Sequence, residues 1–168
     1  NPAVEIIWRY NNNIVAAWGT NTVKETGGKG FTSTSFILMT LTDDHIDGRI
    51  NCEARHNKTG KSVFDTIDLD VKYTPKFTSI PGPSSAEEGE TITLKVKAKA
   101  NPNEVDFMWK RDSGMLVPGP GGVSHSRWSY DKNILTLTNL QKSDAGWWIT
   151  VANNSIGTSE SRIMVKKY

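Results

Sequence analysis

The stretch Asp-Ala-Gly-Trp-Trp-Ile-Thr-Val-Ala-Asn, residues 144–153, decides the fold class of this chain. From Trp147 to Asn153 it is a short run of large and β-branched residues that favours a β-strand. Similar runs recur along the chain between glycine, proline, asparagine and aspartate, and no stretch repeats its apolar residues with the 3.6-residue period of a helix. The chain is therefore predicted to be all-β.

Similar runs elsewhere in the chain complete the set of predicted strands. In the last run of the first part, Ile67, Leu69, Val71 and Tyr73 alternate with charged residues, so we expect one face on a core and one in water. The predicted strands of the first part are 4–10, 14–18, 31–42, 49–56 and 63–73, and those of the second part are 77–80, 91–100, 105–111, 115–117, 126–130, 134–140, 147–153 and 157–167.

The two parts of the chain are copies of one another. Residues 1–9 (NPAVEIIWR) match residues 101–110 (NPNEVDFMWK) with one residue inserted. Trp8 and Cys52 are 44 positions apart, and Trp109 and Thr150 are 41 positions apart. The first copy begins where the second has already completed two or three strands, so about 25 residues of a module of about 100 are expected to be missing. We therefore expect a partial domain at 1–73 and a complete one at 74–168.

On these residues the chain resembles the immunoglobulin superfamily, which implies two tandem β-sandwiches. In the second module 89–98 is similar to strand B, Trp109 to the core tryptophan of strand C, and 144–153, which begins with Asp144, to strand F. Val96 and Thr150 stand at the two cysteine positions and Trp148 at the corner tyrosine. The resemblance therefore implies a module without its inter-sheet disulfide, and we expect the buried Thr150 hydroxyl to have a hydrogen-bond partner.

In the first module the resemblance runs from strand C onward, with Trp8 as the core tryptophan. Cys52, the single cysteine of the chain, falls on the strand-F cysteine position, and alternation places Ile50, Cys52 and Ala54 on the core face. The resemblance implies that the partner of Cys52 lies in strand B, outside this sequence. The alternative is a free buried thiol, which is common for cysteine.

Two sequons, at Asn57 and Asn153, stand at or just beyond the end of strand F in each module. They fit the Asn-x-Ser/Thr pattern of N-glycosylation and, with Cys52, favour the extracellular side of the membrane. The junction at 71–75 and the stretch 52–57 are similar to nephrin-type receptors, which include invertebrate synaptogenesis and myoblast-fusion receptors. That resemblance implies a glycosylated cell-adhesion receptor that binds another immunoglobulin-superfamily protein and is anchored in the membrane by a segment outside this sequence.

Composition excludes several other classes of protein. The chain has 168 residues, a formal net charge of +2 and no apolar run long enough for a membrane span, so neither a membrane-embedded fold nor nucleic-acid binding is expected. No catalytic motif, phosphate loop or metal signature is present, so we expect neither an enzyme nor a cofactor. The histidines (His45, His56 and His125) and the glycine-rich runs 27–30 and 119–122 are interpreted as loop and turn residues, with calcium binding at 43–47 as a minor alternative.

The outward face of strands C, F and G is the candidate binding surface. Alternation places Asn51, Glu53 and Arg55 there, with Asp68 and Asp70 beside them, and Trp18 and Trp128 are further candidates if they are exposed. The alternative is a solvated face with weak cross-strand ion pairs. Two functions remain open: an adhesion-receptor fragment that acts as a semi-rigid spacer or a binding surface, and a structural module pair from a giant intracellular muscle protein of the titin or twitchin kind.

Overall fold

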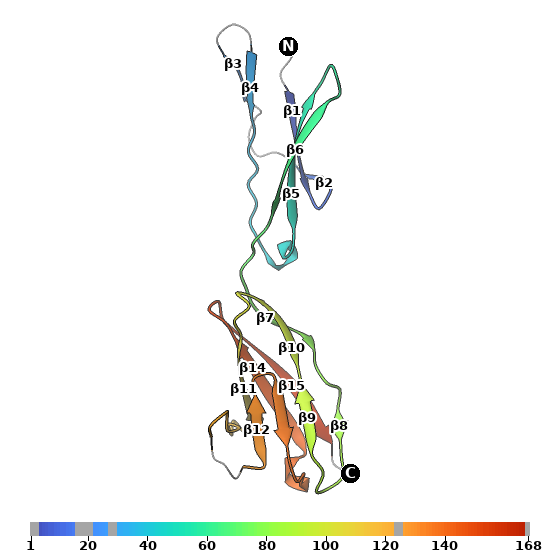
Figure 1. Ribbon diagram of the computed structural model, residues 1–168, viewed down its shortest axis with the longest axis vertical. Helices are drawn as coiled ribbons and strands as arrows, with labels where there is room; N and C mark the ends of the chain where they lie inside the picture. Colours follow the sequence, from blue (N-terminus) through green and yellow to red (C-terminus); the bar gives the residue numbers. More distant parts are fainter. Residues whose placement is uncertain (1–3, 16–21, 27–29, 123–125, 167–168) are drawn as a thin grey trace. The chain divides into compact units, whose positions relative to one another are not determined.

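The computed structural model describes residues 4–15, 22–26, 30–122 and 126–166 (Figure 1). The chain divides into two compact units, residues 1–71 and 72–168. Apart from two short 3₁₀ turns, every regular element in the described residues is a strand. The all-β prediction is therefore confirmed.

The first unit is built on one antiparallel sheet with the order β2-β1-β5-β6, accompanied by the separate hairpin β3–β4. The elements of the first unit are β1 (Val4–Tyr10), β2 (Asn13–Val15), β3 (Thr22–Thr26), β4 (Gly30–Thr34), the 3₁₀ turn η1 (Asp43–His45), β5 (Arg49–His56) and β6 (Ser62–Asp68). The predicted strands 4–10 and 49–56 are confirmed as β1 and β5, whereas β3 was not predicted.

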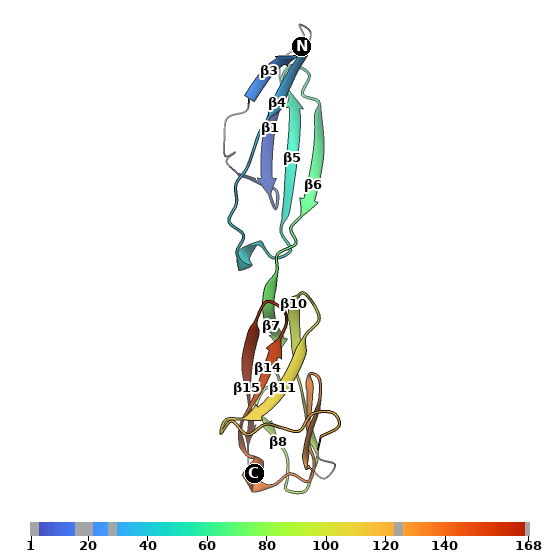
Figure 2. The ribbon, with the colours of Figure 1, turned by 90° about the vertical axis from the view of Figure 1, so that its left-hand side faces the viewer.

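The second unit packs two layers of strands against each other (Figure 2). One layer is the sheet β11-β14-β15-β8, and facing strands form the sheets β12-β13-β9 and β10-β7. Its elements are β7 (Tyr73–Ser79), β8 (Ser84–Ser85), β9 (Ile92–Lys95), β10 (Lys97–Asn101), β11 (Asp106–Arg111), β12 (Trp128–Asp131), β13 (Ile134–Leu137), the 3₁₀ turn η2 (Lys142–Asp144), β14 (Gly146–Asn153) and β15 (Thr158–Lys166).

Strand register shows that the internal repeat is also structural. Trp8 of β1 lies opposite Cys52 of β5, and Trp109 of β11 lies opposite Thr150 of β14. The three strands β1, β5 and β6 of the first unit therefore correspond to β11, β14 and β15 of the second. Cys52 and Thr150 occupy equivalent positions.

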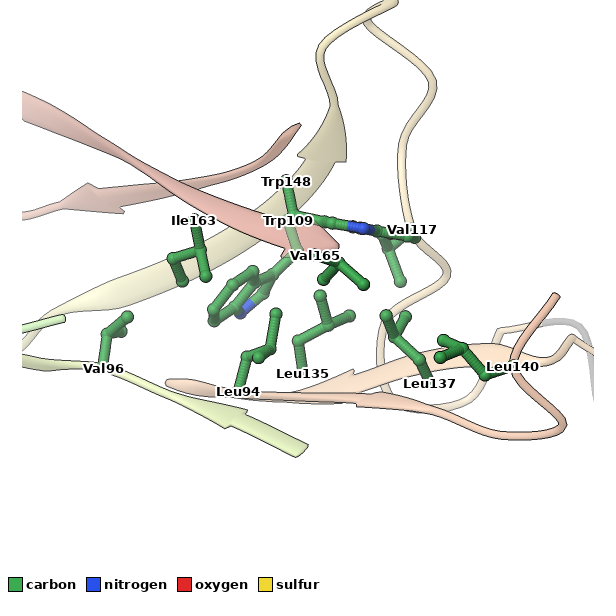
Figure 3. Close-up of a cluster of buried hydrophobic side chains, with 10 residues drawn as sticks. All are labelled: Leu94, Val96, Trp109, Val117, Leu135, Leu137, Leu140, Trp148, Ile163 and Val165. Carbon is green, nitrogen blue, oxygen red and sulfur yellow. The ribbon is translucent and has the colours of Figure 1, made fainter. Parts of the chain in front are cut away.

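The core of the second unit surrounds Trp109, which is fully buried and donates its indole N–H to the carbonyl oxygen of Lys132 at 3.0 Å. Figure 3 shows side chains from the β11-β14-β15 sheet extending toward side chains from the facing strands. The buried apolar cluster consists of Leu94, Val96, Trp109, Val117, Leu135, Leu137, Leu140, Trp148, Ile163 and Val165.

Thr150 lies beside this core without the partner that the sequence led us to expect. Its side chain is fully buried, and its hydroxyl oxygen has no hydrogen-bond partner among the described residues. The expectation of a partner was therefore wrong. A buried hydroxyl without a hydrogen-bond partner costs stability.

Trp148 takes over the role of a corner tyrosine. Its indole N–H donates to the carbonyl oxygen of Asp144 at 3.0 Å, four residues upstream. The buried Asp144 carboxylate accepts two hydrogen bonds from Arg127 and one each from the Trp128 indole and the Gln141 backbone. Burial raises the pKa of Asp144, but these hydrogen bonds outweigh it and hold the pKa below its ordinary value.

The corresponding core face of the first unit is open. Ile67 of β6 is 63% exposed, whereas Ile163, at the equivalent register in β15, is 1% exposed. In residues 4–15, 22–26 and 30–71 no strand corresponds to β7, β9 or β10. The predicted strand 31–42 is accordingly wrong beyond Thr34: β4 ends there, and residues 35–42 pair with no described strand.

Replacing Thr150 with valine is expected to stabilise the second unit by about 1–3 kcal/mol, because it removes an unpaired buried hydroxyl at nearly constant volume. Thermal or urea unfolding measures the change. Thr93→Val, at an exposed position of β9, is the matched control for the strand preference of valine. Equal effects of the two substitutions would contradict this account.

The open core face of the first unit is expected to make a protein of these 168 residues self-associate, because Val63, Ile67, Phe36 and Leu38 all expose apolar surface. The double substitution Val63→Thr and Ile67→Thr should reduce association without unfolding the sheet. Size-exclusion chromatography with light scattering provides the measurement, and a monodisperse, cooperatively melting monomer for the unsubstituted protein would refute the expectation.

Candidate functional site

The candidate site is the outer face of the β2-β1-β5-β6 sheet, the face turned away from Trp8 and Ile50. Strand alternation and register assign its members. They are Glu5, Ile7 and Arg9 from β1, Ile14 from β2, Arg49, Asn51, Glu53 and Arg55 from β5, and Ser62, Phe64, Thr66 and Asp68 from β6.

Glu53 lies at the centre of this face and is 3% exposed. Its Oε2 accepts a hydrogen bond from Arg9 at 2.5 Å, and its Oε1 accepts one from Ser62 at 2.6 Å. Arg55 also donates to Oε1 through Nε at 3.1 Å, and its Nη2 forms an ion pair with the same oxygen at 3.0 Å. Glu53 was predicted as a possible interface residue, with a solvated face of cross-strand ion pairs as the alternative. It does form ion pairs but is not solvated, because side chains from β1, β5 and β6 converge on its carboxylate.

These contacts keep the Glu53 carboxylate ionised. The hydrogen bonds from Ser62 and Arg9 are the largest causes, and together with Arg55 they lower the pKa of Glu53 from 4.5 to about 2, against the opposing effect of burial. One carboxylate therefore links three neighbouring strands through charge-assisted hydrogen bonds.

The other predicted surface residues divide into three groups. Asn51 donates to the hydroxyl of Thr66 at 2.9 Å, and Arg49 pairs with Asp68 at 2.6 Å, both at cross-strand positions. Asp70 is exposed but lies beyond the end of β6. Trp18 lies outside the described residues.

Two hollows meet on the outer face at Asn12 and Asn51. One is also lined by Arg49 and Asp68, and the other by Arg9, Glu53, Arg55 and Phe64. Phe64 is 62% exposed at the edge of the second hollow, and Ile14 is exposed on β2. Arg9, Ser62 and Phe64 were not predicted as site residues, although extending the alternation along β1 and β6 would have identified them.

Cys52 is half-buried beside Asp65, its register partner on β6. Burial, with a smaller contribution from the Asp65 charge, raises the pKa of its thiol. Its disulfide to a residue outside this sequence stays a prediction. Asn57 is exposed in the β5–β6 hairpin and Asn153 at the end of β14, so both sequons lie at accessible hairpin positions, and their glycosylation also stays a prediction.

The remaining candidates have local structural roles. Nδ1 of His45 accepts the backbone N–H of Thr42, and Nδ1 of His56 accepts that of Thr59. Trp128 packs edge-on against Trp148, so it is not an exposed contact residue. His125 and residues 27–29 lie outside the described residues, and Gly121 adopts positive φ in its turn.

In the described part of the chain no three histidine, cysteine or acidic side chains gather as a metal site. The described residues also contain no helix with the length and apolar character needed to cross a bilayer.

Two layers of strands around a buried tryptophan, Trp109, and the corner hydrogen bond of Trp148 are together typical of one class of β-sandwich proteins. Residues 74–154 match the family model described as immunoglobulin domain. The ectodomain of mouse nectin-like molecule 4 superimposes with a TM-score of 0.78 over 99% of this chain and 55% of that chain, at 23% identity. The chain belongs to the immunoglobulin superfamily.

Its relatives include cell adhesion molecules, myotilin and nephrin. Cell adhesion molecule 3 of Xenopus laevis is 30% identical over 160 residues, 94% of this chain and 38% of that protein. Mouse myotilin is 29% identical over 163 residues, 94% of this chain and 32% of that protein. Human nephrin is 28% identical over 137 residues, 80% of this chain and 11% of that protein. The chain thus spans less than half the length of each.

Acid is expected to weaken the first unit through Glu53. Because its pKa is depressed in the folded state, the carboxylate stabilises the sheet fully above about pH 4.5, and this stabilisation is lost as the pH falls toward about 2. NMR titration of the carboxylate should give a midpoint near 2, and unfolding followed through the amide signals of β5 should show the same pH dependence. Glu53→Gln should lack that dependence, and a midpoint near 4.5 in the unsubstituted protein would contradict the network.

Proposed function

We propose that this chain is a recognition fragment of a cell-adhesion receptor ectodomain on the extracellular side of the cell membrane. In this proposal it binds another immunoglobulin-superfamily cell-surface protein, and its parent is a glycoprotein anchored in the membrane by a segment outside this sequence. The observation that carries the proposal is the match of 94% of the chain to a cell adhesion molecule. The outer face of the first unit supports it.

That face has the composition of a protein-binding surface. Phe64 and Ile14 provide exposed apolar anchors, and Arg9 and Arg55 lie partly exposed around the buried Glu53. Interfaces commonly combine aromatic and arginine anchors with a polar rim. Because the three arginines of the face are balanced by Glu5, Glu53 and Asp68, the surface suits a partner of mixed charge rather than a polyanion.

The second unit fits the role of a spacer within this proposal. Its buried core and the fully bonded Asn154 amide make its fold compact at the end where β7 begins. Asn154 donates to the carbonyl oxygens of Tyr73 and Pro102 and accepts from the backbone of Ile156 and Gly157. A unit bonded in this way is expected to keep its shape, as a spacer must.

The second candidate function is a structural module pair of a giant intracellular muscle protein. The similarity to myotilin favours it, as does the valine and threonine pair at the disulfide positions, because cytosolic proteins rarely contain disulfides. The adhesion-molecule relatives favour the extracellular alternative. Glycosylation distinguishes the two, because only proteins of the secretory pathway carry N-glycans.

The intact mass of the chain secreted from eukaryotic cells tests the proposal. Glycosidase treatment should lower the mass, and peptide mapping should place a glycan on Asn57 or Asn153. The double variant Thr59→Ala and Ser155→Ala is the control, since it removes both sequons and leaves both asparagines in place. A chain that reaches the medium without any glycan would contradict the proposal and favour the intracellular alternative.

A further inference from the structure

Another hollow, in the second unit, lies on the outer face of the β11-β14-β15 sheet, at the end of β14. It is open to solvent and has a volume of about 320 Å³. It is lined by Asp106, Phe107, Met108, Val151, Asn153 and Thr158. One of these residues, Asn153, is the acceptor asparagine of a sequon.

The strand register places Asn153 at the edge of an apolar floor. Asp106 and Thr158 lie directly beside Asn153 on the two neighbouring strands. Two residues back along β14, on the same face, Val151 pairs with Met108. Residues two apart on a strand are separated by about 7 Å. The Asn153 amide nitrogen faces the carbonyl oxygens of Asn154 and Gly157, so a sugar joined to it comes within reach of Met108 and Val151 when the Asn153 side chain rotates toward them.

The lining suits the chemistry of an amino sugar. A pyranose ring presents C–H groups on its faces and hydroxyl and acetamido groups around its edge. Met108 and Val151 offer apolar surface to a ring face, while the Asp106 carboxylate and the Thr158 hydroxyl can bond with the polar edge. Small-ligand sites typically combine a mainly apolar lining with a few polar groups in this way.

We propose that this hollow is the binding site for the first N-acetylglucosamine of a glycan attached to Asn153, so that the chain's own glycan covers this face of the second unit. The inference rests on the proposed function, because it requires passage through the secretory pathway. It assigns the outer face of the second unit to carbohydrate and leaves the outer face of the first unit for a protein partner. The other sequon differs, since Asn57, Lys58, Thr59 and Gly60 are all exposed in a turn.

Methionine oxidation in the full chain secreted from eukaryotic cells tests the inference. The glycans are trimmed to a single N-acetylglucosamine, and the rate of sulfoxide formation by hydrogen peroxide is measured for each methionine by peptide mass spectrometry. Met108 is 39% exposed in the bare protein and Met115, outside the hollow, is 58% exposed. Met108 should be oxidised several-fold more slowly than in the Ser155→Ala variant, which lacks the glycan but keeps Asn153, and Met115 should be unchanged.

A nuclear Overhauser effect between the acetyl methyl group of the sugar and the Met108 methyl group is the second expected result. Equal Met108 oxidation in the two proteins together with absence of this effect would overturn the inference, as would a protein glycosylated at Asn57 but bare at Asn153. Those results leave the proposed function standing. A chain that carries no glycan at either site would instead refute the proposed function and this inference together.

Discussion

The packing of the Trp109 indole between two layers of strands is the interaction on which the second unit depends. Val96 and Thr150 stand where a disulfide would otherwise join those layers, and losing such a bridge typically costs about 2–5 kcal/mol. Burying one large apolar side chain contributes about 1.5–3 kcal/mol, so Trp109 with neighbours such as Leu94 and Leu135 can offset that loss. Apolar packing therefore replaces the covalent bond, even though the buried Thr150 hydroxyl has no hydrogen-bond partner in the part of the chain that the structure describes.

The first unit has the same strand register but a different balance of forces. Its core face is open at Ile67 and Val63, and its outer face is held together by the ion pairs and hydrogen bonds of Glu53. A buried carboxylate shared by two arginines and a serine depends on all its partners, because removing one leaves charge uncompensated. The surface that we propose for recognition is thus also the part of this sheet that is most completely bonded.

Much of the fold could be predicted from the sequence, because alternation and turn residues determine where a strand lies and which face each side chain is on. The strands 4–10 and 49–56, and the shared face of Asn51 and Glu53, follow from that pattern. Burial of Glu53 could not be predicted in this way, since it depends on Arg9 and Ser62 from strands distant in sequence.

Two local hydrogen bonds could not be predicted either, because an unexpected residue type makes each of them. Trp148 was placed at the corner tyrosine position from the sequence, but only the structure shows that its indole N–H makes the corner hydrogen bond. His45, the third residue of η1, accepts the backbone N–H of Thr42, which precedes the turn. Asp144 accepts the backbone N–H of Gln141 in the same way in η2, although one acceptor is an imidazole and the other a carboxylate. In each case the geometry is kept while the residue type changes, so only the structure shows the hydrogen bond.

Native-state hydrogen exchange at equivalent amides tests the central claim most directly. The account attributes stability to the closed core around Trp109, so the amide of Thr150 should exchange only through global unfolding of the second unit. The amide of Cys52, at the same register in the open first unit, should exchange through smaller openings and at a faster rate. Equal protection of the two amides, or slower exchange at Cys52, would contradict the claim that the apolar core of the second unit replaces its missing disulfide.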